Sequence, residues 1–267
     1  MKIFSSDEIA AIRQYTLKTQ GISELQFIDR VGESLSLEII SGIIPGHRIV
    51  IFAGPALNGA YAMATARHLC LQGFRPTVYL FNIGGKRLTP DCAAQRDAFV
   101  AACGQESLRE VTGIQFSMPN LQGEVTVVDG IFGTERTAPL SGGYMGIVRY
   151  INEMKPRIIS LDVPSGMLVD AVDGMISRNI IHATLTLAIG TPRVAFFLKE
   201  NAELLGTWKI VPVDFSQKAL DSAPSRFRLM EKSNIRSLLP PRDPFESKAD
   251  AGDAFIVAGS YGMLGAA

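Results

Sequence analysis

The stretch IVIFAGPALNGAYAMATARHL, residues 49–69, decides the fold of this chain. Its apolar start ends at Gly54, and a loop with Asn58 leads into a helical pattern that places Met63 and Leu69 on one face. A strand, a tight loop and a helix in this order point backbone N–H groups and a helix N-terminus at a bound anion or nucleotide. We therefore interpret the other segments as scaffold for this turn or as partners at the same sheet edge.

Short apolar runs recur along the chain and alternate with helical patterns. Strands are expected at residues 49–53, 77–81, 125–128, 157–161, 184–188 and 207–211, and helices at 59–72, 90–103 and 144–154. A further strand is expected near residues 114–116. Strands that are apolar throughout and separated by helices indicate a parallel sheet covered on both faces.

Two helices are expected before the first strand. Ser5 and Glu8 fit a capping box, Gly21 ends the first helix, and a second helix runs from Ser23 to Gly42. Such an extension is typical of a segment that covers a sheet or forms a homodimer. The predicted fold class is therefore α/β, a Rossmann-like three-layer sandwich with a mostly parallel central sheet and two extra N-terminal helices.

The composition changes after Asp214, where the chain becomes rich in Ser, Pro and charged residues. We therefore expect a first domain at residues 1–214 and a linker at 215–246, with at most a short helix near residues 234–238. A new strand is then expected at residues 253–258, followed by a glycine turn. Residues 247–267 are thus expected to be the truncated start of a second domain.

Composition excludes several classes of function. The chain has 267 residues, 47% of them hydrophobic, and a formal net charge of zero, so it lacks the charge expected for binding nucleic acid or a membrane surface. No apolar run approaches the ~20 residues of a membrane span, and the N-terminus lacks a signal peptide. Cys70, Cys92 and Cys103 have no CxxC spacing, so we expect reduced thiols in a cytoplasmic protein, with Cys92 and Cys103 on one helix.

Polar residues follow three of the expected strands. Asn58 follows the first, Asp129 ends another, and Asp162 and Ser165 follow a third. Because ligands of open parallel sheets bind outside the carboxyl ends of strands, these residues are expected to converge. Their oxygens suit an alkali or alkaline-earth cation. The alternative is that the two aspartates only cap their loops through Asx turns.

The loop between residues 130 and 143 is glycine-rich at both ends, with Gly133-Thr134 on one side and Gly142-Gly143 on the other. It could close on a phosphate group, or it could be a plain surface loop. The sequence leaves both open. It contains no Walker A motif and no GxGxxG motif, and no Ser-His-Asp or Cys-His arrangement can be identified.

Taken together, four motifs resemble one family. AGPALNGAYAMATARHL (residues 53–69) is similar to the pattern GPGNNGGDGxxxARxL of the YjeF N-terminal family, the NAD(P)H-hydrate epimerases. VVDGIFGT (127–134) resembles its VDALFGTG, SLDVPSG (160–166) its LDIPSG, and GISELQFIDRVG (21–32) its GI-x-x-x-x-LMERAG. The resemblance covers about residues 1–214, and its motifs occur in the family's order and spacing.

The resemblance implies a function. Family members interconvert the R and S forms of hydrated NADH or NADPH at the hydroxylated ring carbon. It also implies a potassium ion held by Asn58, Asp129 and Ser165. Implied substrate contacts are Leu57, Asn58, Gly59, Ala60 and Tyr61 in the first motif, Gly133, Thr134, Glu135, Arg136, Thr137, Ala138 and Pro139 in the loop, and Asp162.

The tail also resembles a known domain. SKADAGDAFIVAGSYGMLGAA (residues 247–267) is similar to the opening of the ADP- or ATP-dependent NAD(P)H-hydrate dehydratase, a ribokinase-like domain that is commonly fused behind the epimerase in bacteria. The chain thus resembles the front half of a bifunctional nicotinamide-nucleotide repair enzyme.

The first motif departs from the family at the position that matters most. Tyr61 stands where the family has the Asp expected to act as the acid–base group, and a phenol with an ordinary pKa near 10 is a poor base at neutral pH. Alanine replaces three motif glycines, at a cost of about 1 kcal/mol each if the backbone φ is positive. Glu135 replaces a loop glycine, and its charge is unfavourable beside a pyrophosphate. An impaired epimerase and an inactive nucleotide-binding or oligomerisation module both remain open.

Overall fold

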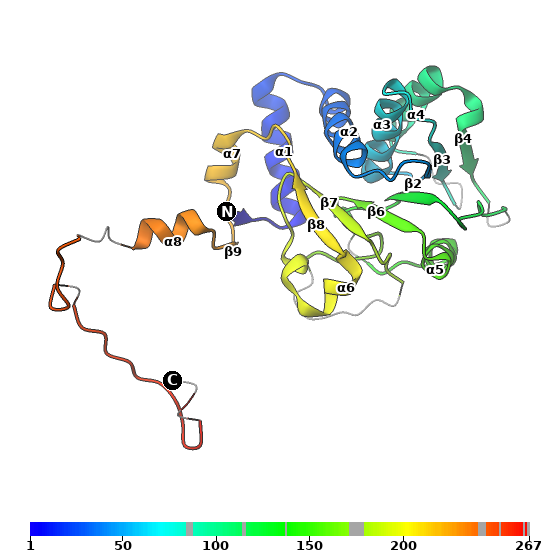
Figure 1. Ribbon diagram of the computed structural model, residues 1–267. Helices are drawn as coiled ribbons and strands as arrows, with labels where there is room; N and C mark the ends of the chain where they lie inside the picture. Colours follow the sequence, from blue (N-terminus) through cyan, green and yellow to red (C-terminus); the bar gives the residue numbers. More distant parts are fainter. Residues whose placement is uncertain are drawn as a thin grey trace. The chain divides into compact units, whose positions relative to one another are not determined.

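Seven strands form the central sheet of the computed structural model (Figure 1). They are β2 (Arg48–Ala53), β3 (Thr77–Phe81), β4 (Leu108–Val111), β5 (Val125–Gly130), β6 (Arg157–Leu161), β7 (Leu185–Ile189) and β8 (Thr207–Val211). Their order is β4-β3-β2-β5-β6-β7-β8, and every neighbouring pair is parallel. The predicted parallel sheet is confirmed.

The structure describes residues 1–83, 88–113, 116–136, 138–170, 179–239, 244–250, 252–263 and 265. Their contacts divide the chain into a large unit, Lys2–Arg228, and a small unit made of Met1 and Leu229–Ala267. All predicted site residues lie in the large unit. The small unit contains one helix, α8 (Lys232–Leu238), among the residues described.

Helices cover both faces of the sheet, as predicted. They are α1 (Ser6–Gln20), α2 (Glu24–Ser41), α3 (Leu57–Leu71), α4 (Pro90–Cys103), α5 (Gly143–Met154), α6 (Ala202–Leu205) and α7 (Gln217–Ser222), with short 3-10 turns at η1 (Gln105–Ser107), η2 (Val194–Phe197) and η3 (Lys199–Asn201). β1 (Lys2–Ile3) and β9 (Phe227–Arg228) form a separate antiparallel pair. Helices α1 to α4 pack on one face and α5 on the other, which makes three layers (Figure 1).

The strand residues divide between the two faces with a period of two. Ile49 and Ile51 of β2 belong to the core under α2 and α3, whereas Val50 and Phe52 belong to the core under α5. Because both faces are buried, the inner strands are mostly apolar along their length, and this pattern predicts their positions, whereas the edge strand β4 (LREV) has two exposed charged residues.

The two N-terminal helices begin and end as their caps predict. Ser5 forms the expected capping box with Glu8, and Gly21 ends α1 in the left-handed conformation, with φ 65°. Ser23 forms a second capping box at the start of α2. Both helices contribute to the core over the sheet, and a dimer through them stays a prediction.

Helix α3 is buried on nearly every side, because α2, α4 and the sheet all pack against it. Small residues allow this close approach. A Cβ on Gly32 of α2 or on Gly130 of β5 would lie 2.5 Å from the Cβ of Ala64 or Ala62, respectively. The alanines at the motif positions are therefore packing residues. Ala56 has a φ of −122° and Ala60 and Ala62 lie within the helix, so the positive-φ cost considered for them does not apply.

Two expected strands are not observed in the described residues. The strand expected near residues 114–116 falls mostly on residues 114 and 115, which lie outside the described part of the chain; Phe116 has no regular structure, and the described edge strand is β4, at Leu108–Val111. Residues 253–258 adopt no regular structure. A strand is stabilised by hydrogen bonds to a neighbouring strand, and within the described residues this segment has none.

The large unit continues beyond the boundary expected at residue 214. Phe215 is buried and its ring stacks on Phe27 of α2, with centroids 5.6 Å apart, and α7 follows. The division into a first domain, a linker and a second domain stays a prediction. Within the described residues, no helix is long and apolar enough to cross a membrane.

Candidate functional site at the sheet's switch point

The chain reverses its direction of travel across the sheet between β2 and β5. From β2 it proceeds outward through β3 to β4, and it then returns to place β5 beside β2, with Ala53 paired to Gly130. The loops after these two strands therefore diverge, and they leave a crevice at the carboxyl edge of the sheet. Asn58 follows β2 and Asp129 lies at the end of β5, so the topology brings these two predicted residues to the same crevice.

Asp129 is the best-anchored polar side chain of the site. It is fully buried, and its carboxylate accepts hydrogen bonds from Ser160 Oγ (2.9 Å), Ser165 N (2.9 Å), Ser165 Oγ (2.5 Å) and Ile131 N (3.3 Å). Burial raises the pKa of Asp129, and these hydrogen bonds oppose the rise. All four donors are neutral, so they orient the carboxylate without cancelling its charge.

Ser165 joins two of the predicted loops. Its hydroxyl donates to Asp129 and accepts from the backbone N–H of Phe132, 2.9 Å away. The loop after β6 is thereby fastened to the loop after β5. The Asx-turn alternative holds only in part, because Asp129 binds the N–H of Ile131 in its own loop but makes three further bonds to Ser160 and Ser165.

Asn58 lies in the first turn of α3 and is 1% exposed. Its Nδ2 donates to the carbonyl oxygen of Leu161 (3.3 Å). Because that carbonyl can only accept, the bond fixes the orientation of the amide and leaves Oδ1 on the other side. Oδ1 has no hydrogen-bond partner within the part of the chain that the structure describes. A buried acceptor without a donor is costly in a folded protein, so it points to a bound group.

The predicted cation ligands therefore fit a cation in their chemistry. Asn58 offers an unpaired amide oxygen, Asp129 a buried carboxylate, and Ser165 a hydroxyl oxygen. Asn58 and Ser165 also contact the same loop, the one after β5. Asn58 packs against Gly133, and Ser165 is hydrogen-bonded to the backbone of Phe132. Hard oxygen donors of this kind suit an alkali or alkaline-earth ion. Within the described residues, no group of three or more His, Cys, Asp or Glu side chains could hold a metal.

A pocket of about 170 Å³ opens beside these residues. Six predicted substrate contacts line it: Leu57, Asn58, Tyr61, Thr134, Glu135 and Asp162. Gly59, Ala60 and Gly133, like Asp129 and Ser165, are buried and do not line it. Two larger pockets, of about 360 and 380 Å³, are lined by none of the predicted substrate or cation contacts.

The rest of the predicted contact loop does not line the pocket. Arg136 lies over the ring of Phe132, 4.7 Å from its centroid, and donates to the carbonyl of Pro139 (2.7 Å). Ala138 and Pro139 are exposed. Thr137 lies outside the described residues, so its predicted contact stays a prediction.

Asp162 is held by a residue that the sequence did not identify. Its Oδ1 pairs with Nη2 of Arg193 at 2.6 Å, and its Oδ2 accepts from the hydroxyl of Thr134 at 3.1 Å. Arg193 is 1% exposed, donates to the carbonyl and hydroxyl of Thr191, and lines the pocket. Asp162 has a φ of 64°, an uncommon conformation outside glycine, and this arrangement maintains it. The one indication of Arg193 is that a carboxylate such as that of Asp162, once buried, requires a positively charged partner.

Arg13 of α1 is the second missed residue. It lines the pocket with Tyr61 and pairs with Glu24 at 3.2 Å. Burial raises the pKa of Tyr61 to about 12, and the positive charge of Arg13 only partly offsets the rise. At neutral pH the phenol at the family's Asp position is thus deprotonated to a smaller extent than that of a free tyrosine, so little of it is available as a base.

Glu135 lies differently from what the motif comparison expected. Although the residue as a whole is exposed, its carboxylate folds onto the backbone N–H of Gly133, 3.1 Å from each carboxylate oxygen, and lines the pocket. Burial raises the pKa of this carboxyl group, with a smaller contribution from the negative charge of Asp162. The backbone hydrogen bonds from Gly133 and from its own N–H, and the charge of Arg13, oppose the rise.

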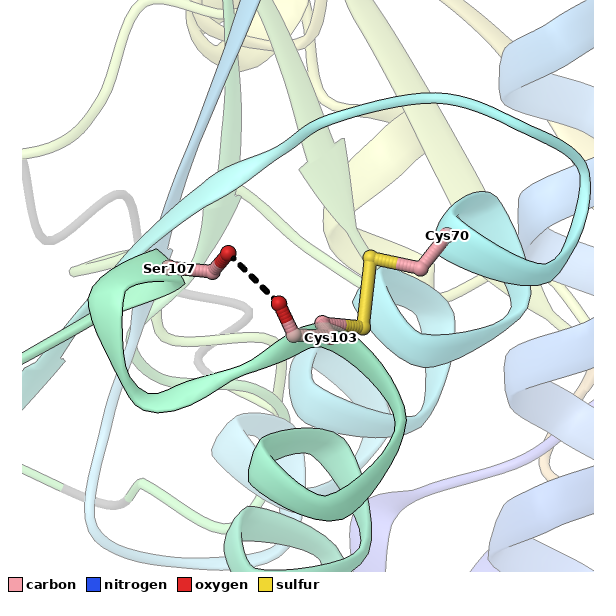
Figure 2. Close-up of a disulfide and its surroundings, with 3 residues drawn as sticks. All are labelled: Cys70, Cys103 and Ser107. Atoms are coloured by element: carbon pink, nitrogen blue, oxygen red, sulfur yellow. Dashed lines mark hydrogen bonds between the residues drawn. A yellow bond between two sulfur atoms is a disulfide. The ribbon is translucent and has the colours of Figure 1, made fainter.

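The expectation of three reduced thiols is wrong. Cys70 and Cys103 form a disulfide, with their Cα atoms 6.2 Å apart, which is within the usual range (Figure 2). Cys103 does lie on the same helix as Cys92, as predicted. The pair forms because α3 and α4 are packed neighbours, so Cys70 and Cys103, near the ends of these helices, meet across 33 residues of sequence. No local spacing could reveal this.

The thiol content of the air-oxidised chain tests the disulfide. Before reduction we expect one thiol to react with a chromogenic disulfide reagent in denaturant, that of Cys92, and three after reduction. In the native chain Cys92 is expected to react slowly, because it is buried and burial raises its pKa to about 12. Three reactive thiols in the unreduced, denatured chain would contradict the pairing.

The fold and the site define a class of protein: a Rossmann-type α/β protein with an oxygen-rich pocket at the switch point of a parallel sheet. Residues 24–195 match the family model described as YjeF-related protein N-terminus. The chain therefore belongs to the YjeF-related N-terminal family, as its motifs predicted.

Named relatives agree with this membership. The chain is 28% identical over 266 residues to the bifunctional NAD(P)H-hydrate repair enzyme Nnr of Thermofilum pendens, covering 100% of this chain and 49% of that protein. It is 26% identical over 265 residues to the enzyme of the same name from Coxiella burnetii, covering 99% and 52%. The chain thus spans about half the length of these relatives.

A shorter relative matches along most of its own length. The NAD(P)H-hydrate epimerase of Leuconostoc gelidum is 26% identical over 226 residues, which cover 81% of this chain and 94% of that protein. A yeast protein of known crystal structure has a TM-score of 0.62 and 22% identity, covering 88% of this chain and 98% of the yeast chain. The structural likeness confirms the fold.

Proposed function

We propose that this chain interconverts the R and S forms of hydrated NADH or NADPH, as an NAD(P)H-hydrate epimerase in nicotinamide-nucleotide repair. One observation carries the proposal: the three segments that bear the family motifs, at Asn58, Thr134 and Asp162, line a single pocket at the switch point. The names of the relatives support the same reaction, and one of them is an epimerase of nearly the same length as this chain.

The reaction needs a proton-transfer group and a closed site. The hydroxylated ring carbon is bonded to the ring nitrogen, so protonation of the hydroxyl lets water leave while the nitrogen lone pair forms an iminium ion. Addition of water to the other face and loss of a proton give the other epimer. A side chain that gives and takes this proton accelerates both steps by roughly 10²–10⁴-fold. The pocket walls limit access of bulk water to the iminium ion.

We further propose that Asn58, Asp129 and Ser165 hold a potassium ion. The unpaired Oδ1 of Asn58 and the buried carboxylate of Asp129 support this assignment. When bound, the ion would supply positive charge at the floor of the pocket. Asp129 then contributes by holding that charge in place, and Ser160 and Ser165 contribute by orienting the carboxylate.

A second candidate is a catalytically inactive domain that binds the nucleotide or assists oligomerisation of a fused dehydratase. Its support is Tyr61, which stands at the family's acid–base position and has a pKa raised to about 12. In either case we propose that residues 1–214 form the epimerase-like domain and residues 215–246 a linker. Residues 247–267 would then begin a dehydratase domain of the kind that this segment resembles in sequence.

A coupled assay distinguishes the two candidates. The purified chain is supplied with the R form of hydrated NADPH and an excess of S-specific dehydratase with its nucleotide, and recovery of NADPH absorbance is followed. We expect a rate above spontaneous epimerisation, and a lower rate when potassium is replaced by choline at equal ionic strength. No acceleration in potassium would rule out the epimerase. Calorimetry with NADP⁺ would then test the binding domain, which requires measurable affinity.

A further inference from the structure

Among the described residues, three carboxylates line the pocket, and their partners distinguish them. Asp162 is ion-paired with Arg193 and hydrogen-bonded by Thr134, which holds its charge in place. Asp7, in the first turn of α1, and Glu135 are both exposed as whole residues, but the Glu135 carboxylate is held against the backbone of Gly133. Glu135 forms no ion pair within the described residues, and its carboxylate accepts only backbone hydrogen bonds there, from Gly133 and from its own N–H. It is therefore the pocket carboxylate that is most free to exchange a proton with a ligand.

The backbone of the loop after β5 brings Glu135 into the pocket. Gly133 makes room for it, because a Cβ at that position would lie 2.8 Å from Glu135 Oε2. The carboxylate folds back over Gly133 and reaches the same pocket as Tyr61. The loop thus supplies a carboxyl group to a site in which the first turn of α3 carries a phenol.

We propose that Glu135 is the proton-transfer group of this chain, and that it replaces the carboxylate missing at position 61. The assignment rests on the proposed epimerase function. It explains how a site with Tyr61 can retain the chemistry. It also assigns a role to the negative charge of Glu135, which the comparison with the family motif predicts to be unfavourable beside a pyrophosphate.

One carboxyl group is enough for the reaction, because it gives one proton in the first step and takes one back in the second. Protonated Glu135 gives its proton to the ring hydroxyl, the C–O bond breaks, and water leaves the iminium ion. A water molecule then adds to the opposite face and returns one proton to the Glu135 carboxylate, directly or through a second water. No oxidant or reductant is consumed, and the enzyme ends in the state in which it began.

The surroundings of Glu135 suit this role. Tyr61, Arg13, Asp7, Asp162 and Arg193 line the pocket with it. Burial raises the pKa of Glu135, with a smaller contribution from the charge of Asp162, while the backbone hydrogen bonds from Gly133 and from its own N–H, and the charge of Arg13, oppose the rise. A raised pKa favours the protonated carboxyl group that the first step needs.

Steady-state kinetics of three variants test the assignment. Glu135→Gln keeps the side-chain size and removes the transferable proton, so kcat is expected to fall by about 10²-fold or more with KM changed by less than about 3-fold. Glu135→Asp should retain more activity than Glu135→Gln. Glu153→Gln, at an exposed glutamate of α5, should match the unaltered chain. Circular dichroism checks that each variant is folded.

The outcomes separate this assignment from the function on which it rests. If the unaltered chain is active and Glu135→Gln stays within about 3-fold of its kcat, the assignment is wrong and the epimerase stands. A rise in KM with kcat unchanged would make Glu135 a binding residue and would also overturn the assignment. An unaltered chain without activity would overturn both proposals together.

Discussion

Replacing Gly54 by alanine is expected to lower the free energy of unfolding by about 3 kcal/mol or more and the melting temperature by about 10 °C. The Cβ of alanine would overlap the backbone carbonyl of Ile131, which a change of side-chain rotamer cannot relieve. Either β2 or the loop after β5 must move, and the hydrogen bond from Gly54 N to the Gly130 carbonyl (3.1 Å) would be strained. Thermal unfolding followed by circular dichroism measures the effect.

The same substitution at Gly146 is the matched control. Gly146 is exposed within α5, and a Cβ there would have open space around it. Alanine is a better helix former than glycine, so Gly146→Ala is expected to stabilise the chain by about 0.5–1 kcal/mol. Equal melting temperatures for Gly54→Ala and the unaltered chain would contradict this close approach of the Gly54 and Ile131 backbones.

The central sheet could be predicted because its strands are buried on both faces. Runs such as residues 49–53 are apolar without interruption and stop at residues that end strands, so their positions follow from the sequence. The site residues could be brought together for a related reason. In a parallel sheet the carboxyl ends of neighbouring strands share one edge, and this applied to Asn58, Asp129 and Asp162 without knowledge of side-chain positions.

The missed residues depend on tertiary distances that sequence spacing does not encode. Arg193 pairs with Asp162 across 31 residues, and Arg13 reaches the pocket from a helix that lies outside the minimal α/β unit. The disulfide likewise depends on how α3 and α4 pack. The role of Glu135 could not be predicted either, because its carboxylate folds back on its own loop and its sequence position alone suggests exposure.

Breaking the buried ion pair of the site is the other change with a large expected effect. Arg193→Met keeps much of the side-chain volume but leaves the Asp162 carboxylate, 5% exposed, without its cationic partner. Removing one partner of a buried pair costs about 3–5 kcal/mol, because the remaining charge has lost both water and its counter-ion. We expect a loss of this size in denaturant unfolding, together with loss of epimerase activity, since Asp162 also holds Thr134.

Two controls distinguish a buried charge from a general packing defect. In the double variant Arg193→Met with Asp162→Asn the uncompensated charge is gone, so the loss should be smaller than in Arg193→Met alone. Arg30→Met removes an exposed ion pair, in which Arg30 Nη1 and Asp214 Oδ2 are 3.6 Å apart, and should cost less than about 1 kcal/mol. If the double variant is no more stable than Arg193→Met, packing of the arginine stem, and not the charge of Asp162, determines the loss. The pair would then be a structural link between the loop after β6 and the residue before η2, and another contact would have to hold Asp162 in the pocket.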